Sequence, residues 1–284
     1  MTKLAYVLKS IWQEPSNRSQ RLRRILFFFG WQLWKRLTDI PVTVRLFNGL
    51  RLRVYCDCDT SPAAVYYSIP NGNHISFLRK HLDGGTFVDV GANVGLVSLL
   101  VADKAQHAVL FEPNPIAVIR ARENLGINRL NFEVFSQALS DMAGTVEFEH
   151  AGKVGSCNRT VDRFTPSVPT ITVRRTTLDQ FLQDHPRMPP ISAVKIDVEG
   201  HENSVLRGMR EFLKNQRPKL IMFEYLQRTN IADVLTLFKD VDFLVFELSS
   251  GGSRIATDRV EPLQDLFACP NEMAALFEIT DLKQ

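Results

Sequence analysis

The sequence predicts an α/β fold in which helices cover both faces of a mostly parallel, doubly wound sheet. Short segments rich in apolar and β-branched residues alternate with segments of helical periodicity over most of the 284 residues. A turn with two glycines, residues 91–95, joins the first buried strand, 87–90, to a helix that begins at Leu96. This order opens a βαβ unit and makes the turn the best candidate for a cofactor site.

The glycine turn favours a ligand without a pyrophosphate. It reads Gly91-Ala92-Asn93-Val94-Gly95. A dinucleotide fingerprint, G-x-G-x-x-G, needs a second glycine where this turn has Asn93, because the pyrophosphate touches bare backbone there. Asp89 places a carboxylate near the end of the strand, where it would hold the ammonium group of S-adenosylmethionine. An ordinary βα turn without a ligand is the alternative interpretation.

Composition and charge indicate a globular domain with a basic extension. Hydrophobic residues make up 45% and charged residues 23% of the chain, which excludes a disordered protein. Residues 1–55 hold 11 Lys/Arg but only 2 Asp/Glu, although the net charge of the whole chain is +3. We therefore predict a basic helical arm and hairpin over residues 1–64 and a cofactor-binding domain over 65–284. The acidity of the larger domain argues against nucleic acid as the partner.

The basic arm contains a segment, residues 18–37, that could serve either of two roles. Residues 18–37 place basic residues on both sides of an aromatic-rich middle, as in helices at a membrane interface. A helix that caps the domain with its aromatic side buried is the alternative. No signal peptide is evident, and the apolar run from Ile25 to Trp31 is far shorter than the roughly 20 residues that span a bilayer. The four cysteines form no metal or disulfide pattern, so we expect a cytoplasmic protein, with peripheral membrane contact as an option.

A hairpin and a helix are expected before the first strand of the sheet. Alternating segments over residues 42–46 and 50–54 flank Asn48-Gly49, which is a strong hairpin signal. We expect this hairpin to form a lid or side wall. A helix within residues 68–82 is expected to end at Asp83-Gly84-Gly85.

The second and third strands add candidate ligand residues. The second strand ends at Glu112, 21 residues after Gly91, close to the spacing of an acid that binds ribose hydroxyls. A third strand over 131–135 is followed by Gln137 and Ala138, where an adenine would rest. Ligands bind at the carboxyl ends of parallel strands, so three strand ends point to one crevice.

The remaining elements are expected in a regular order. Two strands near residues 145–149 and 170–174 enclose a loop over 152–160, which is a candidate substrate loop. The later elements are a strand at 219–224, a helix at 230–239, a strand at 243–248 and a closing segment at 266–277.

A second group of ionisable residues follows the strand at residues 193–196. It comprises Asp197, Glu199, His201 and Glu202, and a helix is expected to continue through Phe212. Such groups are costly at a strand end unless they are exposed, paired or used. Acids at a helix N-terminus are the structural alternative, and it explains the glutamates better than Asp197 or His201. A carboxylate–imidazole metal site is a further alternative, although its other ligands are not evident.

These motifs together resemble the FkbM-type family of S-adenosylmethionine-dependent methyltransferases. The resemblance covers roughly residues 66–248 and depends on four motifs: Asp89-Val90-Gly91-Ala92-Asn93-Val94-Gly95, Phe111-Glu112-Pro113, Ala138-Leu139-Ser140-Asp141 and Lys195-Ile196-Asp197-Val198-Glu199-Gly200-His201-Glu202. It implies a Rossmann-like, seven-stranded sheet with an antiparallel last strand. It also implies O-methylation of hydroxyls on sugars, polyketides or other secondary metabolites.

The resemblance also implies roles for the matching residues. Glu112 would bind the ribose of S-adenosylmethionine, Gln137 and Ala138 would meet the adenine, and Asp197 and His201 would face the transferred methyl group. The methionine end would lie on the glycine turn and its neighbours, Asp89, Gly91, Ala92, Asn93 and Gly95.

Methyl transfer to a hydroxyl requires a base, and His201 is the first candidate because imidazoles ordinarily titrate near neutrality. Asp197 is the second candidate, either as the base or as the residue that orients His201. The expected acceptor is a small molecule or glycan with a free hydroxyl. An NAD(P)-dependent oxidoreductase and a non-catalytic, membrane-associated binding module are the competing functions.

Overall fold

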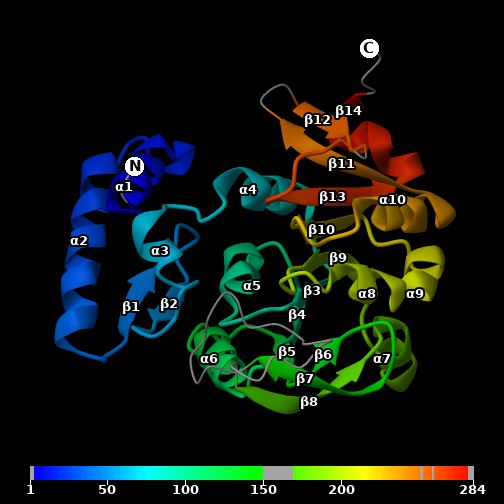
Figure 1. Ribbon diagram of the computed structural model, residues 1–284, viewed down its shortest axis with the longest axis horizontal. Helices are drawn as coiled ribbons and strands as arrows, with labels where there is room; N and C mark the ends of the chain where they lie inside the picture. Colours follow the sequence, from blue (N-terminus) through cyan, green and yellow to red (C-terminus); the bar gives the residue numbers. More distant parts are fainter. Residues whose placement is uncertain (1–2, 150–168, 250–251, 258, 281–284) are drawn as a thin grey trace.

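The computed structural model describes residues 3–149, 169–249, 252–257 and 259–280. Its main feature is a sheet in which the strands lie in the order β14-β12-β11-β13-β10-β9-β3-β4-β5 (Figure 1). The strands of this sheet are β3 (Thr86–Val90), β4 (His107–Phe111), β5 (Phe132–Phe135), β9 (Ile191–Ile196), β10 (Leu220–Tyr225), β11 (Phe243–Ser249), β12 (Gly252–Ile255), β13 (Gln264–Pro270) and β14 (Ile279–Thr280).

The strand directions confirm the predicted sheet. Strands β5, β4, β3, β9 and β10 are parallel to one another. Strand β13 lies antiparallel between β10 and β11, so the last of the seven strands of the expected fold is the antiparallel one. Two short strands, β12 and β14, extend the sheet beyond β11. The closing segment predicted near residues 266–277 is β13 followed by the 3-10 helix η2 (Asn271–Phe277).

Helices cover both faces of the sheet, as Figure 1 shows. One face carries α4 (Gly72–His81), α5 (Leu96–Val101) and α6 (Pro115–Gly126), and the other carries α7 (Leu178–Asp184), α8 (Glu202–Arg207), α9 (Arg210–Asn215) and α10 (Ile231–Asp240). Successive residues of each strand point to opposite faces of the sheet, and so toward different helices. Val88 therefore belongs to the hydrophobic cluster that contains Val205 and Leu237, whereas Phe87 belongs to the cluster that contains Leu78. The single helix expected through residue 212 is instead α8 and α9, because α8 ends at Gly208.

The N-terminal extension packs against the α5 and α6 side of the sheet domain. It contains α1 (Lys3–Gln13), η1 (Pro15–Asn17), α2 (Arg21–Leu37), the predicted hairpin β1 (Val42–Arg45) and β2 (Arg51–Val54), and α3 (Ala63–Tyr66). The β1–β2 pairing confirms the hairpin signal around Asn48-Gly49. Leu52 and Trp31 share a hydrophobic cluster with Leu99 of α5, and Arg53 forms an ion pair with Glu123 of α6. The extension and the sheet domain thus share a core, and the boundary proposed at residue 64 stays a prediction.

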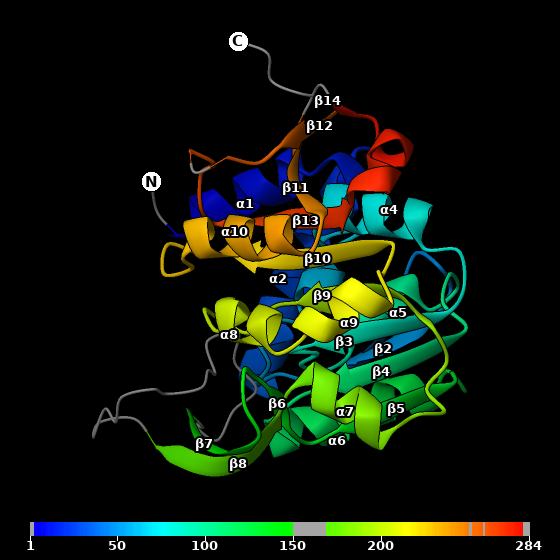
Figure 2. The same cartoon turned by 90° about the vertical axis from the view of Figure 1, so that its right-hand side faces the viewer.

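A small second sheet projects from the β5 edge of the molecule (Figure 2). It comprises β6 (Ala138–Leu139), β7 (Gly144–Glu149) and β8 (Thr170–Thr176), in the order β6-β8-β7. Strands β7 and β8 are the two strands expected near residues 145–149 and 170–174, and they pair antiparallel. The candidate substrate loop over residues 152–160 lies outside the described residues.

Candidate active site

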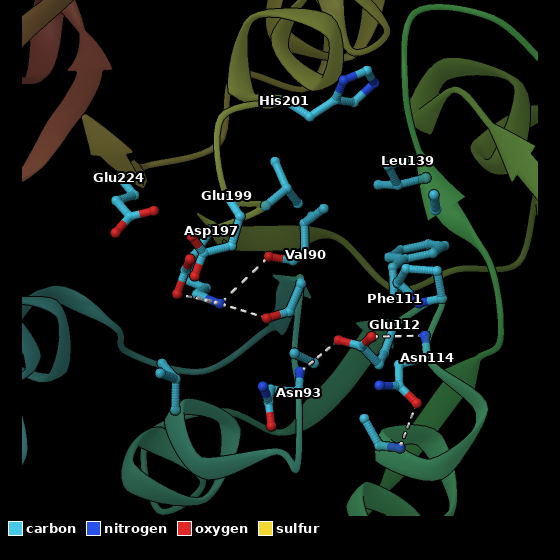
Figure 3. Close-up of a pocket in the computed structure, with 18 of the residues that line it drawn as sticks. Val90, Asn93, Phe111, Glu112, Asn114, Leu139, Asp197, Glu199, His201 and Glu224 are labelled. Atoms are coloured by element: carbon cyan, nitrogen blue, oxygen red, sulfur yellow. Dashed lines mark hydrogen bonds and ion pairs between the residues drawn. The ribbon is translucent and has the colours of Figure 1, made fainter. Parts of the chain in front are cut away.

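A cavity of about 270 Å³ lies at the carboxyl ends of β3, β4, β9 and β10 (Figure 3). The carboxyl ends of parallel strands meet at one edge of a sheet, which is why these motifs come together. Most of the predicted site residues line this cavity: Gly91, Ala92, Asn93, Glu112, Ala138, Asp197 and His201. The remaining three, Asp89, Gly95 and Gln137, are not part of its lining.

Gly91 allows two strand ends to meet at the floor of the cavity. Its φ of +73° lies in the left-handed region, and a Cβ atom there would overlap with the carbonyl oxygen of Asp197. The backbone N–H of Asp197 donates to the carbonyl oxygen of Val90 at 3.0 Å. The N–H of Gly91 donates to the carbonyl oxygen of Phe111 at 2.9 Å. The glycine turn is therefore held between β4 and the end of β9.

Asn93 shapes the turn and also lines the cavity. Its φ of +51° is a conformation that asparagine tolerates better than most residues. The Oδ1 atom of Asn93 accepts a hydrogen bond from the N–H of Val94 at 2.8 Å, and its own N–H donates to Oε2 of Glu112 at 2.8 Å. The turn thus directs one backbone N–H group at Glu112, the residue predicted to bind the ribose.

Glu112 is a buried carboxylate held by two backbone donors. Its Oε1 atom accepts from the N–H of Asn114 at 2.8 Å, and its side chain is almost fully enclosed, with an exposed fraction of 6%. Burial raises the pKa of Glu112 to about 7, while the two backbone hydrogen bonds act in the opposite direction. Each carboxylate oxygen has a second lone pair. Glu112 can therefore still accept hydrogen bonds from ligand hydroxyls.

An apolar wall adjoins Glu112. Its members come from β4, β6 and β7, and they are Phe111, Ala138, Leu139 and Phe148. The ring of Phe111 stacks on Phe135 with a centroid separation of 5.6 Å, which fixes its orientation. This wall suits a flat aromatic group. The sequence signal identified Ala138 but not Phe148, because the pairing of β7 with β8 brings that residue to the cavity.

Asp89 faces away from the cavity, toward α5. It is fully buried, and its carboxylate accepts a hydrogen bond from Oγ of Ser98 at 2.7 Å. Its Oδ1 atom lies 3.2 Å from Nζ of Lys195. The two residues are register partners on the adjacent parallel strands β3 and β9, so both side chains emerge on the same face of the sheet. Asp89 thus forms a buried ion pair with Lys195, and its expected contact with a ligand ammonium group stays a prediction.

Lys195 also lines the cavity, although the sequence analysis did not name it as a site residue. Its Nζ atom donates to the carbonyl oxygen of Gly91 at 2.8 Å and lies 3.4 Å from Oδ2 of Asp197. Burial would lower the pKa of Lys195, but Asp197 and Asp89 outweigh it, and the pKa is raised above its usual value. A lysine within an apolar strand could have indicated a buried ion pair, because the other apolar strand, β3, carries the acid Asp89. Lys195 fixes both the glycine turn and Asp197.

Three carboxylates form an acidic end of the cavity (Figure 3). One oxygen from each of Asp197, Glu199 and Glu224 lies within 4.8 Å of the others. Burial, together with the charge of Asp197, raises the pKa of Glu199 to about 7 and that of Glu224 to about 8. Nη2 of Arg228 lies 3.3 Å from Oε2 of Glu199. This end of the cavity suits a positively charged group.

His201 lies on another side of the cavity. Its Nε2 atom is 3.0 Å from Oγ of Ser140, and that hydroxyl donates to Oδ1 of Asp141 at 3.1 Å. Figure 3 shows the imidazole directed away from Asp197 and the other carboxylates. Ser140 and Asp141, rather than Asp197, therefore orient His201. Among the described residues, the group of side chains that could hold a metal ion is Asp197, Glu199 and Glu224, and it does not include His201.

Glu202 stabilises the loop between β9 and α8. Its Oε1 atom accepts from the backbone N–H groups of Val198 at 3.1 Å and Gly200 at 3.0 Å, and its side chain is fully buried. These contacts hold the loop that carries Glu199 and His201. Glu202 thus has a structural role at the first turn of α8, as the alternative of acids at a helix N-terminus indicated.

The fold and the cavity at the carboxyl ends of its strands define a Rossmann-like methyltransferase architecture. The Methyltransferase FkbM domain matches residues 89–247, which is more than half of the chain. This protein belongs to the FkbM methyltransferase family, as its motifs predicted.

Known proteins of this class resemble parts of the chain. The hexuronic acid methyltransferase AglP of Haloferax volcanii is 29% identical over 127 residues, 45% of this chain and 51% of AglP, so the chain spans about half the length of that relative. A methyltransferase FkbM from Methylobacillus flagellatus aligns with a TM-score of 0.44 at 15% identity, over 66% of this chain and 44% of the other. TYW2 of M. jannaschii in complex with AdoMet aligns with a TM-score of 0.43 at 13% identity, over 82% and 86%.

Proposed function

We propose that this protein is an S-adenosylmethionine-dependent methyltransferase that methylates a hydroxyl group of a sugar-containing acceptor. The observation that carries the proposal is the position of Glu112, held by two backbone N–H groups between the glycine turn and an apolar wall. Membership in the FkbM family supports methyl transfer. The sugar acceptor is supported by the similarity to a hexuronic acid methyltransferase.

The side chains that line the cavity match the three parts of S-adenosylmethionine. Glu112 would accept hydrogen bonds from the ribose hydroxyls, and Phe111 and Leu139 would contact the adenine. The acidic end at Asp197 and Glu224 would face the ammonium and sulfonium charges. The same carboxylates would repel a pyrophosphate, which disfavours the alternative of an NAD(P)-dependent oxidoreductase.

The residues of the chain would position the reactants and move one proton. S-adenosylmethionine supplies a methyl group on a positively charged sulfur. Lys195 holds the glycine turn and Asp197 in place, which preserves the alignment that an in-line displacement needs. His201, oriented by Ser140, would accept the proton of the acceptor hydroxyl, and Asp197 is the alternative base.

The substitution Glu112→Ala tests the proposal through cofactor affinity. It removes a charged hydrogen-bond acceptor for the ribose. The loss of one such hydrogen bond is worth about 1.5–3 kcal/mol, so we expect the affinity for S-adenosylmethionine to fall about 10- to 100-fold. Calorimetric titration with S-adenosylmethionine, S-adenosylhomocysteine and NADH measures this effect and tests for binding of NADH. The matched control is Glu211→Ala, an exposed residue of α9, which should bind like the wild type. Equal affinity in the two variants would refute the ribose assignment.

Cofactor affinity should also depend on pH. Glu112 and Glu199 have pKa values raised to about 7, and Glu224 to about 8. Their ionised forms accept hydrogen bonds from hydroxyl groups and attract cations, so binding should strengthen as pH rises from 6 to 8, by about tenfold. Titrations of the wild type across this range measure the slope, and Glu112→Gln should flatten it. An affinity that falls with rising pH would contradict the acidic lining as the binding surface.

A further inference from the structure

The solvent-facing side of α2 carries an apolar stripe bordered by basic residues. We propose that this surface binds the face of a membrane that contains anionic lipids. The proposal does not depend on the proposed catalytic function, because it concerns the N-terminal extension and its test measures no activity.

The stripe follows the helical repeat of α2. Its members recur every three or four residues, which places them on one side of the helix. They are Leu22, Leu26, Phe29, Leu33 and Leu37, with exposed fractions of 70%, 69%, 46%, 59% and 74%. Such a run of large apolar side chains in water is costly and marks an interaction surface.

The opposite side of α2 already packs on the protein. Phe28 and Trp31 are buried, the ring of Phe28 contacts Tyr66 of α3 edge-on at 5.2 Å, and Trp31 joins the cluster under the hairpin. The capping helix that the sequence offered as an alternative explains this buried side. It leaves the exposed stripe without a partner among the described residues.

Charge identifies the kind of surface that would cover the stripe. Residues 18–37 contain six Lys/Arg and no Asp/Glu. Arg18, Arg23, Lys35 and Arg36 are exposed on this helix or just before it. Basic residues beside an apolar face match anionic headgroups above acyl chains. The exposed aromatic rings of Trp12, Phe27 and Trp34 suit the same interfacial region.

The stripe belongs to a larger apolar region at one end of the molecule. Among the described residues, 12 of the 16 exposed large hydrophobic side chains lie within residues 4–47. In Figure 1, α1 and α2 lie at the end of the molecule opposite β11–β14. No described helix is both long and apolar enough to cross a bilayer. The α2 helix would therefore lie in the plane of the membrane surface.

A second copy of the chain is a poorer partner for this surface. Two identical stripes could pair, but their contact would bring the basic residues of both copies together. Since residues 18–37 supply no acid to neutralise them, like charges would oppose the pairing. An anionic bilayer removes this repulsion.

Flotation of the full chain with lipid vesicles tests the proposal. We expect binding to phosphatidylcholine vesicles that contain roughly one-third phosphatidylglycerol, weaker binding to phosphatidylcholine alone, and a decrease with added salt. Leu26→Glu with Leu33→Glu should lower the partition coefficient at least tenfold. The matched control replaces two exposed aliphatic residues elsewhere, Ile119→Glu with Leu276→Glu, and should bind like the wild type.

Two further measurements distinguish the contribution of charge to membrane binding from self-association of the chain. The charge variant Arg18→Gln, Arg23→Gln, Arg36→Gln leaves the stripe intact and should lose the preference for phosphatidylglycerol. Analytical ultracentrifugation of the wild type and of the Leu26/Leu33 variant reports self-association. Failure of the wild type to float with anionic vesicles would overturn the proposal. So would equal flotation of the Leu26/Leu33 variant, or a wild-type dimer that this variant dissociates.

Discussion

Replacement of Lys195 by methionine is expected to lower the free energy of unfolding by about 3–5 kcal/mol, because it leaves a buried charge without its partner. Asp89 is fully buried, and Lys195 is its ion-pair partner. The loss of Nζ also releases the carbonyl oxygen of Gly91. Urea denaturation measures the change in stability. Cofactor affinity should fall as well, since the glycine turn loses its anchor.

Two controls separate this ion pair from a general effect of losing a lysine. Lys214→Met removes an exposed lysine that pairs with Glu211, and its effect should stay below about 1 kcal/mol. Adding Asp89→Asn to Lys195→Met should recover part of the loss, because the uncompensated buried charge disappears. If Lys195→Met and Lys214→Met were equally stable, the Asp89–Lys195 pair would have no structural importance.

The substitution His201→Ala is expected to lower turnover by about 100- to 10,000-fold, the usual contribution of a positioned base. Affinity for S-adenosylmethionine should change little, because Glu112 and the glycine turn lie on other sides of the cavity. Formation of S-adenosylhomocysteine with hydroxylated sugar acceptors measures turnover, and calorimetry measures binding.

Two variants complete the test of the base. Ser140→Ala removes the hydroxyl that orients the imidazole, so turnover should fall by less than in His201→Ala. Asp197→Asn tests the alternative base. Full activity in His201→Ala together with a large loss in Asp197→Asn would assign proton removal to Asp197.

The elements around the site that were predicted correctly are those set by local sequence. The strand, the glycine turn and the helix that follow one another over residues 86–101 were evident from apolar periodicity and turn residues. Glu112 was placed at the same strand edge as the glycine turn because one βαβ unit fixes the distance along the chain between that turn and the next strand end, and it does line the cavity. The hairpin around Asn48-Gly49 was likewise a local signal.

The parts that were missed depend on contacts between distant segments. Lys195 lies 104 residues from Gly91 in the sequence, and only the register of β9 beside β3 places its Nζ atom on that carbonyl oxygen. The same register pairs Asp89 with Lys195. Phe148 reaches the cavity through the β7–β8 pair, which no pattern near Glu112 could indicate.

The sequence by itself determined the class of this protein: the alternation of strands and helices, the motif set of the FkbM family, and the convergence of strand ends on one crevice. The tertiary structure alone decided which acids face that crevice and which are paired beneath it. It also showed that α2 buries one apolar side and exposes another. The physical reason is that periodicity reports which side chains are apolar, whereas strand register and packing between distant segments decide which partner, or solvent, each side chain meets.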